Sequence, residues 1–571
     1  HTQLKLITYY YRTNSFLGTV RRICGLLIRS RTMQSKICFI RVRALTILAV
    51  LGQSIIIKPD SGEGQKETCA ALRNHETHSS VEISVGNPPQ SFSLVADTGS
   101  DKVIVKDCAC EKCRPEWGAS CFHGPDRSNS FNLSFFMVED VDEQEDDDEQ
   151  EVHKRHQGQK VKKHREEAHM YISFGSGAVQ TRVASDEVRL GSLKTYMKNG
   201  LLLIVEENLD INDRFEGILG LGRPDFKGSR RPGHHPAEKD DEIHVPGFFE
   251  QAKVQRFSLC FNHQADGVLG MNTPASSNPL SSVGHVHWGL DFQGISVGNQ
   301  KHRLEICDPA SKKKGMESAC GLIPDSGTTL IAAAEPQLLA LYESVCNNWS
   351  RCKEAHKQIV KDAAAGKLPV MAANGSPEPG QIEVHPVETL QALLTGCSDW
   401  MAGVDLNKEM PKLTFHVAGA NGNKDELVIS PRNYILLSEA ELEMPTVVKR
   451  HGQKKLVKVK QQKQVCTMAF TPLEYETANN GPVWIMGMPL FYEHTVHYDR
   501  GNGKERGVTM AFTRQDKEAC GQCQSVSASV GKKPKSLLLN SNGVSTTTGM
   551  ASLNRITKQP ILRVPTDLES M

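Results

Sequence analysis

The sequence predicts an all-β protein, because it contains many short strands with alternating apolar and polar residues, frequent turn residues and few helical stretches. Its 571 residues include 46 Gly and 27 Pro, and 39% are hydrophobic and 23% charged. This composition excludes collagen-like, coiled-coil and wholly disordered chains. A chain of this length is too long for one core, so we expect two lobes with tails and insertions.

The first predicted strands form a hairpin. Residues 81–85 and 91–95 alternate apolar and polar side chains around the turn Asn87-Pro-Pro-Gln90, and the second strand leads into Asp97. Further strands are expected at residues 170–174, 257–261, 412–416 and 484–486. The best candidates for helices are residues 335–345 and 386–394.

Residues 1–57 are expected to be an N-terminal extension that contains a secretory signal. Basic residues follow Met33, and then come the apolar run 44–51 and the small residues Gly52 and Ser54. This order of features is typical of a signal peptide. A short uncleaved anchor is the alternative, although the run is too short to span a bilayer comfortably. Beyond this anchor we expect no stable membrane span.

The net charge of +1 hides an asymmetry between the start of the chain and the rest. Residues 1–43 carry nine Lys or Arg and no acidic residue; of the 67 basic residues, 58 then remain against 66 Asp and Glu, which gives residues 44–571 a net charge of −8. Phosphate binding needs a net basic face, so we expect no nucleic-acid partner.

Three segments do not resemble packed structure. A charged insertion at residues 137–169 holds ten acidic residues within residues 139–151, followed by a basic cluster. Such charge blocks usually stay solvated, and a docking or processing loop is the alternative. Residues 447–464 form a basic insertion, and residues 516–571 form a Ser-, Thr- and Lys-rich tail that we expect to be disordered.

The number of cysteines indicates that the protein resides in an oxidising compartment. Apart from Cys24 and Cys38, 14 of the 16 cysteines remain, an even set that suits disulfides in a secreted chain. We therefore expect the secretory pathway, either outside the cell or in an acidic, lysosome-like vesicle. The cluster Cys108, Cys110, Cys113 and Cys121 with His123 allows two interpretations, a zinc site or loop disulfides, and the compartment favours disulfides. Cys346–Cys352 and Cys520–Cys523 are candidate local pairs, but spacing alone does not establish connectivity.

One short sequence motif occurs twice, and each copy contains a candidate catalytic Asp. The copies are Leu94-Val-Ala-Asp97-Thr98-Gly99-Ser100 and Leu322-Ile-Pro-Asp325-Ser326-Gly327-Thr328-Thr329. In each, an apolar strand ends at Asp, a costly place for a carboxylate unless it is paired or hydrogen-bonded. If the two loops face each other, the carboxylates share one proton because like charges so close do not both ionise easily. One then acts as general base on a water and the other as general acid.

Each copy also has a later apolar segment that ends in Gly, at Phe215-Glu-Gly-Ile-Leu-Gly-Leu-Gly222 and Trp484-Ile-Met-Gly487. With these partners the chain resembles the pepsin-like aspartic proteases from about residue 80 to residue 515. Further matching segments are Phe248-Phe249, His287-Trp288, Ile429–Tyr434, Val496–Arg500 and Met510–Phe512. The resemblance implies a bilobal fold of two β-barrel-like lobes with a central cleft and a flap hairpin. We place the lobes at residues 80–275 and 276–515, after a short pro-segment or linker at residues 58–79.

The resemblance also implies roles for individual residues. Asp97 and Asp325 match the catalytic pair, and Thr98 and Ser326 match hydroxyls that bond across the lobes. The remaining matches are Ser100 and Thr328 with Gly99 and Gly327 in the catalytic loops, Phe174, Gly175 and Ser176 at the substrate-binding flap, and Cys397 and Cys466 at the second-lobe disulfide. The expected activity is that of an aspartic endopeptidase on extended protein or peptide substrates. Neither a cofactor nor a metal is required, and we expect a monomer.

Some positions depart from the family pattern. Phe174 stands where a flap Tyr is usual, and Ile104 where its Trp partner is usual, while Tyr171 is the flap Tyr if the register is three residues off. Pro324 precedes Asp325 and lacks a backbone donor. Met488-Pro489 replaces the usual acidic residue after the second partner Gly. These departures motivate an alternative, a catalytically weak or inactive relative that binds peptides. Outside the family, a disulfide-rich secreted interaction protein would use both phrases merely as turns.

Overall fold

The structure is a computed structural model that describes residues 67–110, 120–140, 162–209, 216–223, 244–263, 265–300, 302–365, 370–371, 377–378, 384–450, 453–502, 507–515, 520–521 and 523. The expected signal segment at residues 1–57 lies outside these residues. Lys66–Met571 form one compact unit. Strands make up 44% of the structure, which confirms the all-β prediction. Among the described helices, none is long and apolar enough to cross a membrane.

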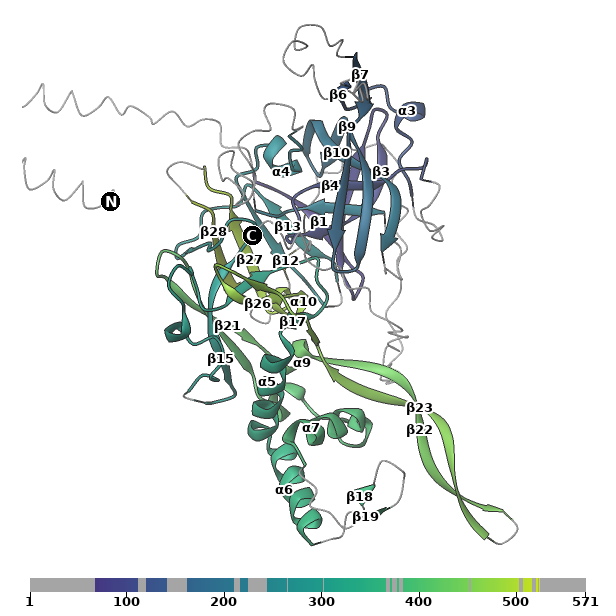
Figure 1. Cartoon of the computed structure of the whole chain (residues 1–571), viewed down its shortest axis with the longest axis vertical. Coiled ribbons are helices and arrows are strands. Elements are labelled where there is room, and N and C mark those ends of the chain that lie inside the picture. The colour runs from purple at the N-terminus through teal and green to yellow at the C-terminus, as the bar shows by residue number, and fades with distance from the viewer. Residues whose placement is uncertain are drawn as a thin grey trace, which may run out of the picture. The chain divides into compact units, whose positions relative to one another are not determined.

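The largest described sheet has 14 strands and joins the first half of the chain to its C-terminal strands (Figure 1). Along the sheet these are β14 (Leu280–Ser281), β28 (Thr509–Arg514), β27 (His494–Asp499), β12 (Arg256–Cys260), β13 (Gly267–Met271), β1 (Thr68–Asn74), β2 (Ser79–Val85), β3 (Gln90–Asp97), β11 (Gly217–Gly220), β4 (Val103–Lys106), β10 (Leu193–Leu209), β9 (Gly177–Leu190) and β5 (Asn132–Leu133), with β8 (His169–Phe174) paired to β9.

A second sheet of eight described strands forms the other lobe. Its order is β21 (Lys424–Ile429), β20 (Leu413–Ala418), β15 (Leu290–Val297), β16 (Gly321–Pro324), β26 (Gly481–Met486), β17 (Ile331–Ala333) and β24 (Phe470–Pro472), with β25 (Glu476–Thr477) paired to β26. The two-stranded pairs are β6 (Phe135–Asp140) with β7 (Lys162–Glu167), β18 (Val370–Met371) with β19 (Pro377–Glu378), and β22 (Ile435–Arg450) with β23 (Gln453–Met468). All six strands expected from the sequence are present.

The strands of both sheets contribute side chains to the core. Some strands alternate buried and exposed side chains, and others are buried on both faces. In β2 the side chains of Val81, Ile83 and Val85 are buried while Glu82 is exposed, as period-two alternation requires. β3 and β16 are buried along the stretch that approaches the two Asp residues. Asp97 is the last residue of β3 and Asp325 directly follows β16, so each acid lies at the end of a buried stretch of strand.

Among the described residues, most of the helices lie in the second half of the chain. They are α3 (Gly124–Arg127), α4 (Phe248–Gln251), α5 (Glu335–Asn348), α6 (Ser350–Ala364), α7 (Pro386–Thr395), α8 (Leu406–Glu409), α9 (Pro431–Tyr434) and α10 (Met488–Phe491), with 3-10 turns η1 (Pro309–Ser311) and η2 (Cys397–Asp399). α5 and α7 confirm the two predicted helices. The sequence analysis missed α6, whose charged residues obscure its apolar side and which packs through the buried Cys352.

Two of the segments expected to be unpacked contain paired strands. β6 and β7 form an antiparallel hairpin that sets Glu139 opposite Lys163 and Asp140 opposite Lys162, at the two ends of the charged insertion. The basic insertion at residues 447–464 lies in the β22–β23 hairpin, which Figure 1 shows as a long ribbon leaving the second lobe. The expectation that these segments lack regular structure is therefore wrong where strands are described.

The disulfides correct the prediction for the tail and for residues 58–79. Cys520 pairs with Cys260 on β12 and Cys523 pairs with Cys69 on β1, so Cys520 and Cys523 are not bonded to each other. β1 itself lies within the expected pro-segment or linker and joins the first sheet between β13 and β2. Cys346–Cys352, Cys397–Cys466 and Cys307–Cys320 are also disulfide-bonded.

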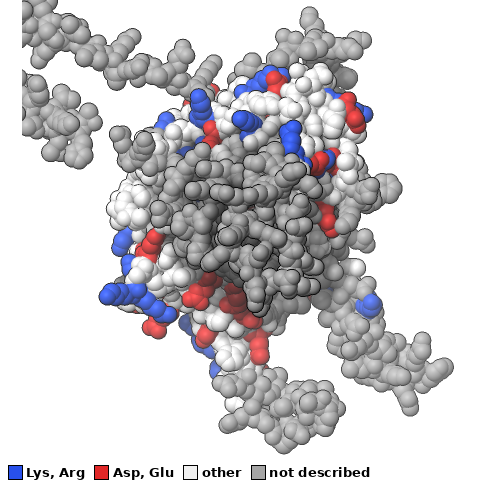
Figure 2. All heavy atoms as spheres, turned by 45° about the horizontal axis from the view of Figure 1, so that its top comes forward, with Lys and Arg blue, Asp and Glu red and all other residues white. Residues whose placement is uncertain are grey.

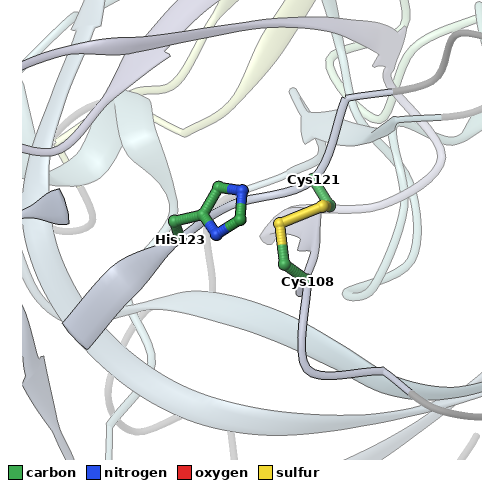
Figure 3. Close-up of side chains that lie close together, drawn as sticks. All are labelled: Cys108, Cys121 and His123. Atoms are coloured by element: carbon green, nitrogen blue, oxygen red, sulfur yellow. A yellow bond between two sulfur atoms is a disulfide. The ribbon is translucent and has the colours of Figure 1, made fainter. Parts of the chain in front are cut away.

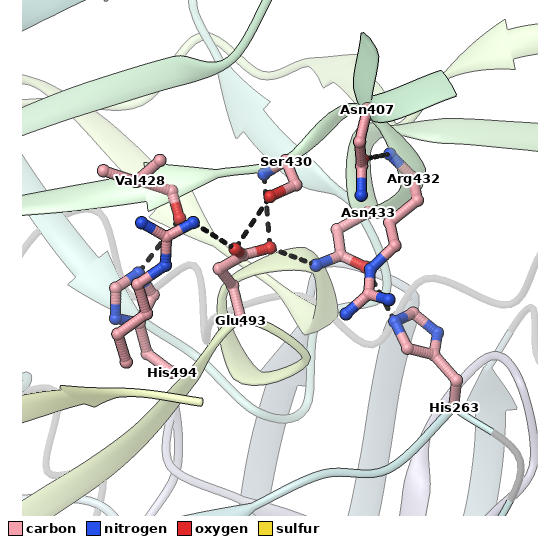
Figure 4. A network of polar contacts seen from close by, with 9 residues as sticks. His263, Asn407, Val428, Ser430, Arg432, Asn433, Glu493 and His494 are labelled. Carbon is pink, nitrogen blue, oxygen red and sulfur yellow. Dashed lines mark hydrogen bonds and ion pairs between the residues drawn. The ribbon is translucent and has the colours of Figure 1, made fainter. Parts of the chain in front are cut away.

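A buried carboxylate ties the lobes together away from the two repeated phrases (Figure 4). Glu493 accepts hydrogen bonds from the backbone N–H of Ser430 at 3.2 Å, from its hydroxyl at 2.8 Å and from the Asn433 amide at 2.5 Å. Arg514 forms an ion pair with the same carboxylate at 3.1 Å. Asn433 in turn bonds the His263 ring at 2.7 Å. The charge on Glu493 is thus compensated, and α9 is held against the first sheet.

Candidate active site

The two Asp residues sit at equivalent places in the two sheets. β3 runs parallel to β11, and Asp97 lies opposite Gly220. β16 runs parallel to β26, and the backbone N–H of Asp325 donates to the Met486 carbonyl at 2.9 Å. Because each strand ends between buried neighbours, both carboxyl groups are almost fully buried. The two copies of the phrase thus place two acidic side chains in one buried site.

Both carboxyl groups are held by the same pair of donors. The Gly99 N–H donates to Asp97 Oδ1 at 2.8 Å, and the Ser100 hydroxyl donates to Oδ2 at 2.5 Å. In the second loop, the Gly327 N–H donates to Asp325 Oδ1 at 2.9 Å and the Thr328 hydroxyl to Oδ2 at 2.5 Å. These donors fix the planes of both carboxyl groups.

Four hydrogen bonds cross between the loops through Thr98 and Ser326. The Thr98 N–H donates to Ser326 Oγ at 3.0 Å, and the Ser326 N–H donates to Thr98 Oγ1 at 3.0 Å. Each hydroxyl also donates to the other strand, Thr98 to the Pro324 carbonyl at 3.0 Å and Ser326 to the Ala96 carbonyl at 2.7 Å. The two hydroxyl groups therefore lock the loops in one relative position.

Burial and mutual repulsion make the pair share one proton. Burial raises the pKa of Asp97, although hydrogen bonds from Ser100 and Gly99 oppose the rise. Burial and then the nearby Asp97 charge raise the pKa of Asp325 well above its usual range, against hydrogen bonds from Thr328 and Gly327. The two carboxyl groups also hydrogen-bond each other, so the proton belongs to the coupled pair.

The loop glycines are needed because the opposite acid lies so close. A Cβ at Gly99 would lie 2.9 Å from the Asp325 carboxylate oxygens. A Cβ at Gly327 would lie 2.3 Å from Asp97 Oδ1. No side chain fits at either position without moving the pair, so both glycines serve close approach.

This arrangement agrees with the comparison of the chain with known proteins. A model of the family "Eukaryotic aspartyl protease" matches residues 80–507. The chain belongs to this family. Among its relatives, Renin-2 of Mus musculus is 22% identical over 302 residues, which cover 51% of this chain and 62% of that protein. Renin of Canis lupus familiaris is 19% identical over 453 residues, 77% of this chain and 81% of that protein.

Plasmepsin VIII of Plasmodium berghei (strain Anka) is another relative, 22% identical over 266 residues. That match covers 46% of this chain and 60% of plasmepsin VIII. The chain thus spans less than two thirds of the length of Renin-2 and of plasmepsin VIII. Family membership confirms the resemblance drawn from the two phrases and their partner segments.

In this aspartyl protease family member, the hairpin β8–β9 turns at Gly175 and Ser176, where the flap was predicted. Phe174 is only 4% exposed and belongs to the same apolar cluster as Ile104. The two departures from the family pattern therefore pack in one cluster instead of forming a hydrogen bond. Tyr171 is 71% exposed on β8, so it does not occupy the buried position that Phe174 holds. Gly177 has φ 136° and faces the Asn208 carbonyl, which excludes any side chain there.

The cysteine cluster of this family member forms loop disulfides (Figure 3). Cys108 is bonded to Cys121, and Cys110 is also disulfide-bonded, while Cys113 lies outside the described residues. His123 lies near the bonded sulfurs. The disulfide interpretation is confirmed, because a sulfur in a disulfide is no longer a thiolate ligand for zinc.

The sequence analysis missed three residues that support the loops. Glu216, immediately before β11, accepts hydrogen bonds from the backbone N–H groups of Ser93 and Ser120 at 2.6 and 2.9 Å. His287 is buried and hydrogen-bonds the Gly99 backbone, and Arg223 reaches from the end of the first partner segment to the Gly284 carbonyl. His287 and Glu216 lay inside quoted motifs, but nothing in their spacing revealed these contacts.

Proposed function

We propose that the chain is an aspartic endopeptidase of the secretory pathway that hydrolyses peptide bonds in extended protein substrates. The observation that carries this proposal is the pair Asp97 and Asp325, hydrogen-bonded to each other and each held by a backbone N–H and a hydroxyl. Hydroxyl bonds across the lobes keep the pair in place before any substrate binds. Such preorganisation lowers the cost of reaching the transition state.

Because the pair shares one proton, one carboxylate acts as base and the other as acid, and the proposed scheme places the proton on Asp325. Ionised Asp97 accepts a proton from a water whose oxygen attacks the amide carbon, while Asp325 gives its proton to the carbonyl oxygen. The resulting tetrahedral species has two hydroxyl groups on that carbon. When the C–N bond breaks, the nitrogen takes the proton from Asp97 and one hydroxyl returns its proton to Asp325. The pair thereby regains its starting protonation, and neither metal nor cofactor is needed in this scheme.

The substrate and the compartment follow from other features. An extended peptide suits a site between two sheets, because its backbone can bond to strands on either side while the β8–β9 hairpin excludes water. The described disulfides fit the extracellular space or an acidic vesicle. Lys and Arg lie among Asp and Glu on the described part of the face in Figure 2, which gives no support to a nucleic-acid partner. We expect a monomer.

Replacing either acid tests the activity. Asp97→Asn and Asp325→Asn should each lower kcat/KM on an unfolded protein substrate at acid pH by about 1,000-fold or more, because each removes a proton-transfer group. Asp126→Asn, at an exposed acid on α3, is the matched control and should retain activity. Thermal unfolding of all three variants shows whether the fold persists. Full cleavage by a folded Asp97→Asn protein contradicts the mechanism.

Phe174 and Ile104 favour a second candidate, a catalytically weak relative that binds peptides. Phe174 offers no side-chain hydrogen bond, so at this position of the hairpin the contact with Ile104 is apolar packing. A statine-type transition-state mimic distinguishes the candidates. Binding of the mimic without cleavage of any protein substrate between pH 3 and 7 supports the binding module, whereas cleavage that the mimic blocks supports the enzyme.

A further inference from the structure

The flap hairpin β8–β9 is bonded to β10 along its second strand, and β10 is bonded to β4 (Figure 1). At the turn of the hairpin, Gly177 pairs with Leu209 of β10. Farther back on β10, Ile204 pairs with Lys106, the last residue of β4. Residues 204–209 therefore carry β10 from the end of β4 to the tip of the flap.

A buried ion pair joins β4 to this part of β10. Lys106 Nζ lies 3.1 Å from Glu207 Oε2, and the two side chains are only 8% and 2% exposed. Glu207 lies opposite Val179 of the flap strand β9. Val179 belongs to the same apolar cluster as Phe174 and Ile104. Separating the two charges is costly in such a place, because each would stay buried without this partner.

A second ion pair starts from the next residue of the chain. Asp107, whose side chain is 4% exposed, accepts a hydrogen bond from Arg182 of β9 through one oxygen and from the Ala109 N–H at 2.9 Å through the other. Arg182 lies opposite His169, the first residue of β8, so this pair acts at the base of the flap. Consecutive residues of an extended chain project to opposite faces of a sheet, so the two pairs hold the hairpin from both faces.

These ion pairs restrain the hairpin in a way that its apolar contacts do not. Phe174 and Ile104 meet through apolar packing, which has no preferred direction. Opposite charges in a buried site hold a short separation, because a gap between them leaves both without compensation. The position of the flap strands relative to β4 is therefore fixed by charges at the base of the hairpin and along β10.

We propose that Lys106, Asp107, Arg182 and Glu207 form a flap clamp, a set of positioning residues that hold the hairpin where it closes on a bound peptide. This inference rests on the proposed function, since it concerns how the same site retains its substrate. The clamp acts on the peptide through β9 and β10. A flap held in place contacts the peptide both before and during cleavage, so loss of the clamp raises KM more than it lowers kcat.

Neutral replacements test the pair nearer the tip. Lys106→Met combined with Glu207→Gln removes both charges together, which avoids leaving one of them buried alone. We expect KM for a peptide substrate to rise by about 5-fold or more while kcat stays within about 2-fold of wild type. A variant that merely contains less folded protein shows the reverse, a lower apparent kcat at unchanged KM.

The pair at the base allows a conservative replacement. Arg182→Met removes the charge and should raise KM by about 3-fold or more, whereas Arg182→Lys keeps a charge on a side chain that is 19% exposed and should raise KM less. The matched control is Lys194→Met combined with Glu187→Gln. It removes an ion pair of 2.7 Å between the same two strands, β10 and β9, at their end away from the flap, and should leave KM unchanged. The clamp is disproved if the Lys106 and Glu207 double variant raises KM no more than this control.

Hydrogen exchange separates this result from failure of the proposed function, because it requires neither cleavage nor a bound peptide. Exchange of backbone amides in residues 169–190 is compared with exchange in residues 413–429 of the second sheet, for the wild type and each variant. In the Lys106 and Glu207 double variant, exchange that is faster by about 10-fold or more in residues 169–190 alone supports the clamp even if the chain cleaves nothing. A change in residues 169–190 no larger than that in residues 413–429 overturns the clamp even where the chain cleaves protein.

Discussion

The Asp97 loop and the Asp325 loop use the same bonds, although Ala96 precedes the first acid and Pro324 precedes the second. In each, a Gly N–H and a hydroxyl three residues on hold the carboxyl group. Burial raises the pKa of both acids, and their mutual repulsion couples the two titrations. Near-identical local structure therefore gives two acids that titrate as one pair, because each one's environment includes the other.

The loops also differ in how closely the opposite acid approaches their glycines. Gly327→Ala places a Cβ 2.3 Å from Asp97 Oδ1, whereas Gly99→Ala places one 2.9 Å from Asp325. We expect Gly327→Ala to cost about 1–3 kcal/mol of unfolding free energy and to abolish cleavage, with a smaller effect for Gly99→Ala. Denaturant unfolding and kcat/KM on one peptide measure both. Equal effects would mean that the two loops are interchangeable.

The hydroxyl bonds between the loops should be cooperative. Ser326→Ala leaves the Thr98 N–H and the Ala96 carbonyl without this partner, and Thr98→Val leaves the Ser326 N–H and the Pro324 carbonyl without theirs. Each change should cost about 1–3 kcal/mol, since buried polar groups lose their bonds. The double variant should cost less than the sum, as measured by chemical denaturation. Simple additivity would show that the bonds act independently.

The contributions of the two acids and of His287 to folding stability should change with pH in opposite directions. A carboxyl group with a raised pKa stabilises the fold below its unfolded pKa, and that contribution is lost as pH rises through the folded pKa. For His287, burial lowers the pKa from 6.5 to about 4, with Asp101 and the Gly99 backbone opposing it and Arg223 adding to it. Its contribution to stability is therefore lost as pH falls from about 6.5 to about 4.

Replacing His287 separates these contributions. In His287→Phe, the fall in unfolding free energy between pH 7 and pH 4 should be smaller than in the wild type, by up to about 3 kcal/mol. The measurement is urea unfolding at pH 7, 5.5 and 4, and the comparison is of slopes with pH, not of absolute stability. An unchanged slope would show that His287 does not titrate across the transition.

We expect the smallest effect from replacing Pro324. This residue precedes Asp325, whereas Ala96 holds the equivalent position before Asp97. Pro324 bonds to the other loop through its carbonyl, which accepts a hydrogen bond from the Thr98 hydroxyl. The Ala96 carbonyl accepts from the Ser326 hydroxyl in the same way. Pro324→Ala should therefore change unfolding free energy by less than about 1 kcal/mol and leave cleavage within a few-fold of wild type. A large loss of activity would give the proline a role that its contacts do not show.

Much of the fold could be predicted because the informative signals are local. Alternation at residues 81–85 and 91–95 requires only neighbouring residues, and the two phrases repeat with the same lead-in strands. α6 was missed because charged residues line most of its surface. The pairing of Cys520 with Cys260 and of Cys523 with Cys69 joins residues 260 and 454 positions apart, which no local pattern indicates.

The sequence by itself determined the fold class, the pair of Asp residues and the hydroxyls and glycines beside them, because strand periodicity and a duplicated phrase are written in consecutive residues. Only the tertiary structure decided that burial raises the pKa of both acids, that Phe174 and Ile104 meet in one apolar cluster, and that His287 reaches Gly99. Those properties depend on burial and on distances between segments far apart in the chain, and both arise only when the two sheets pack together.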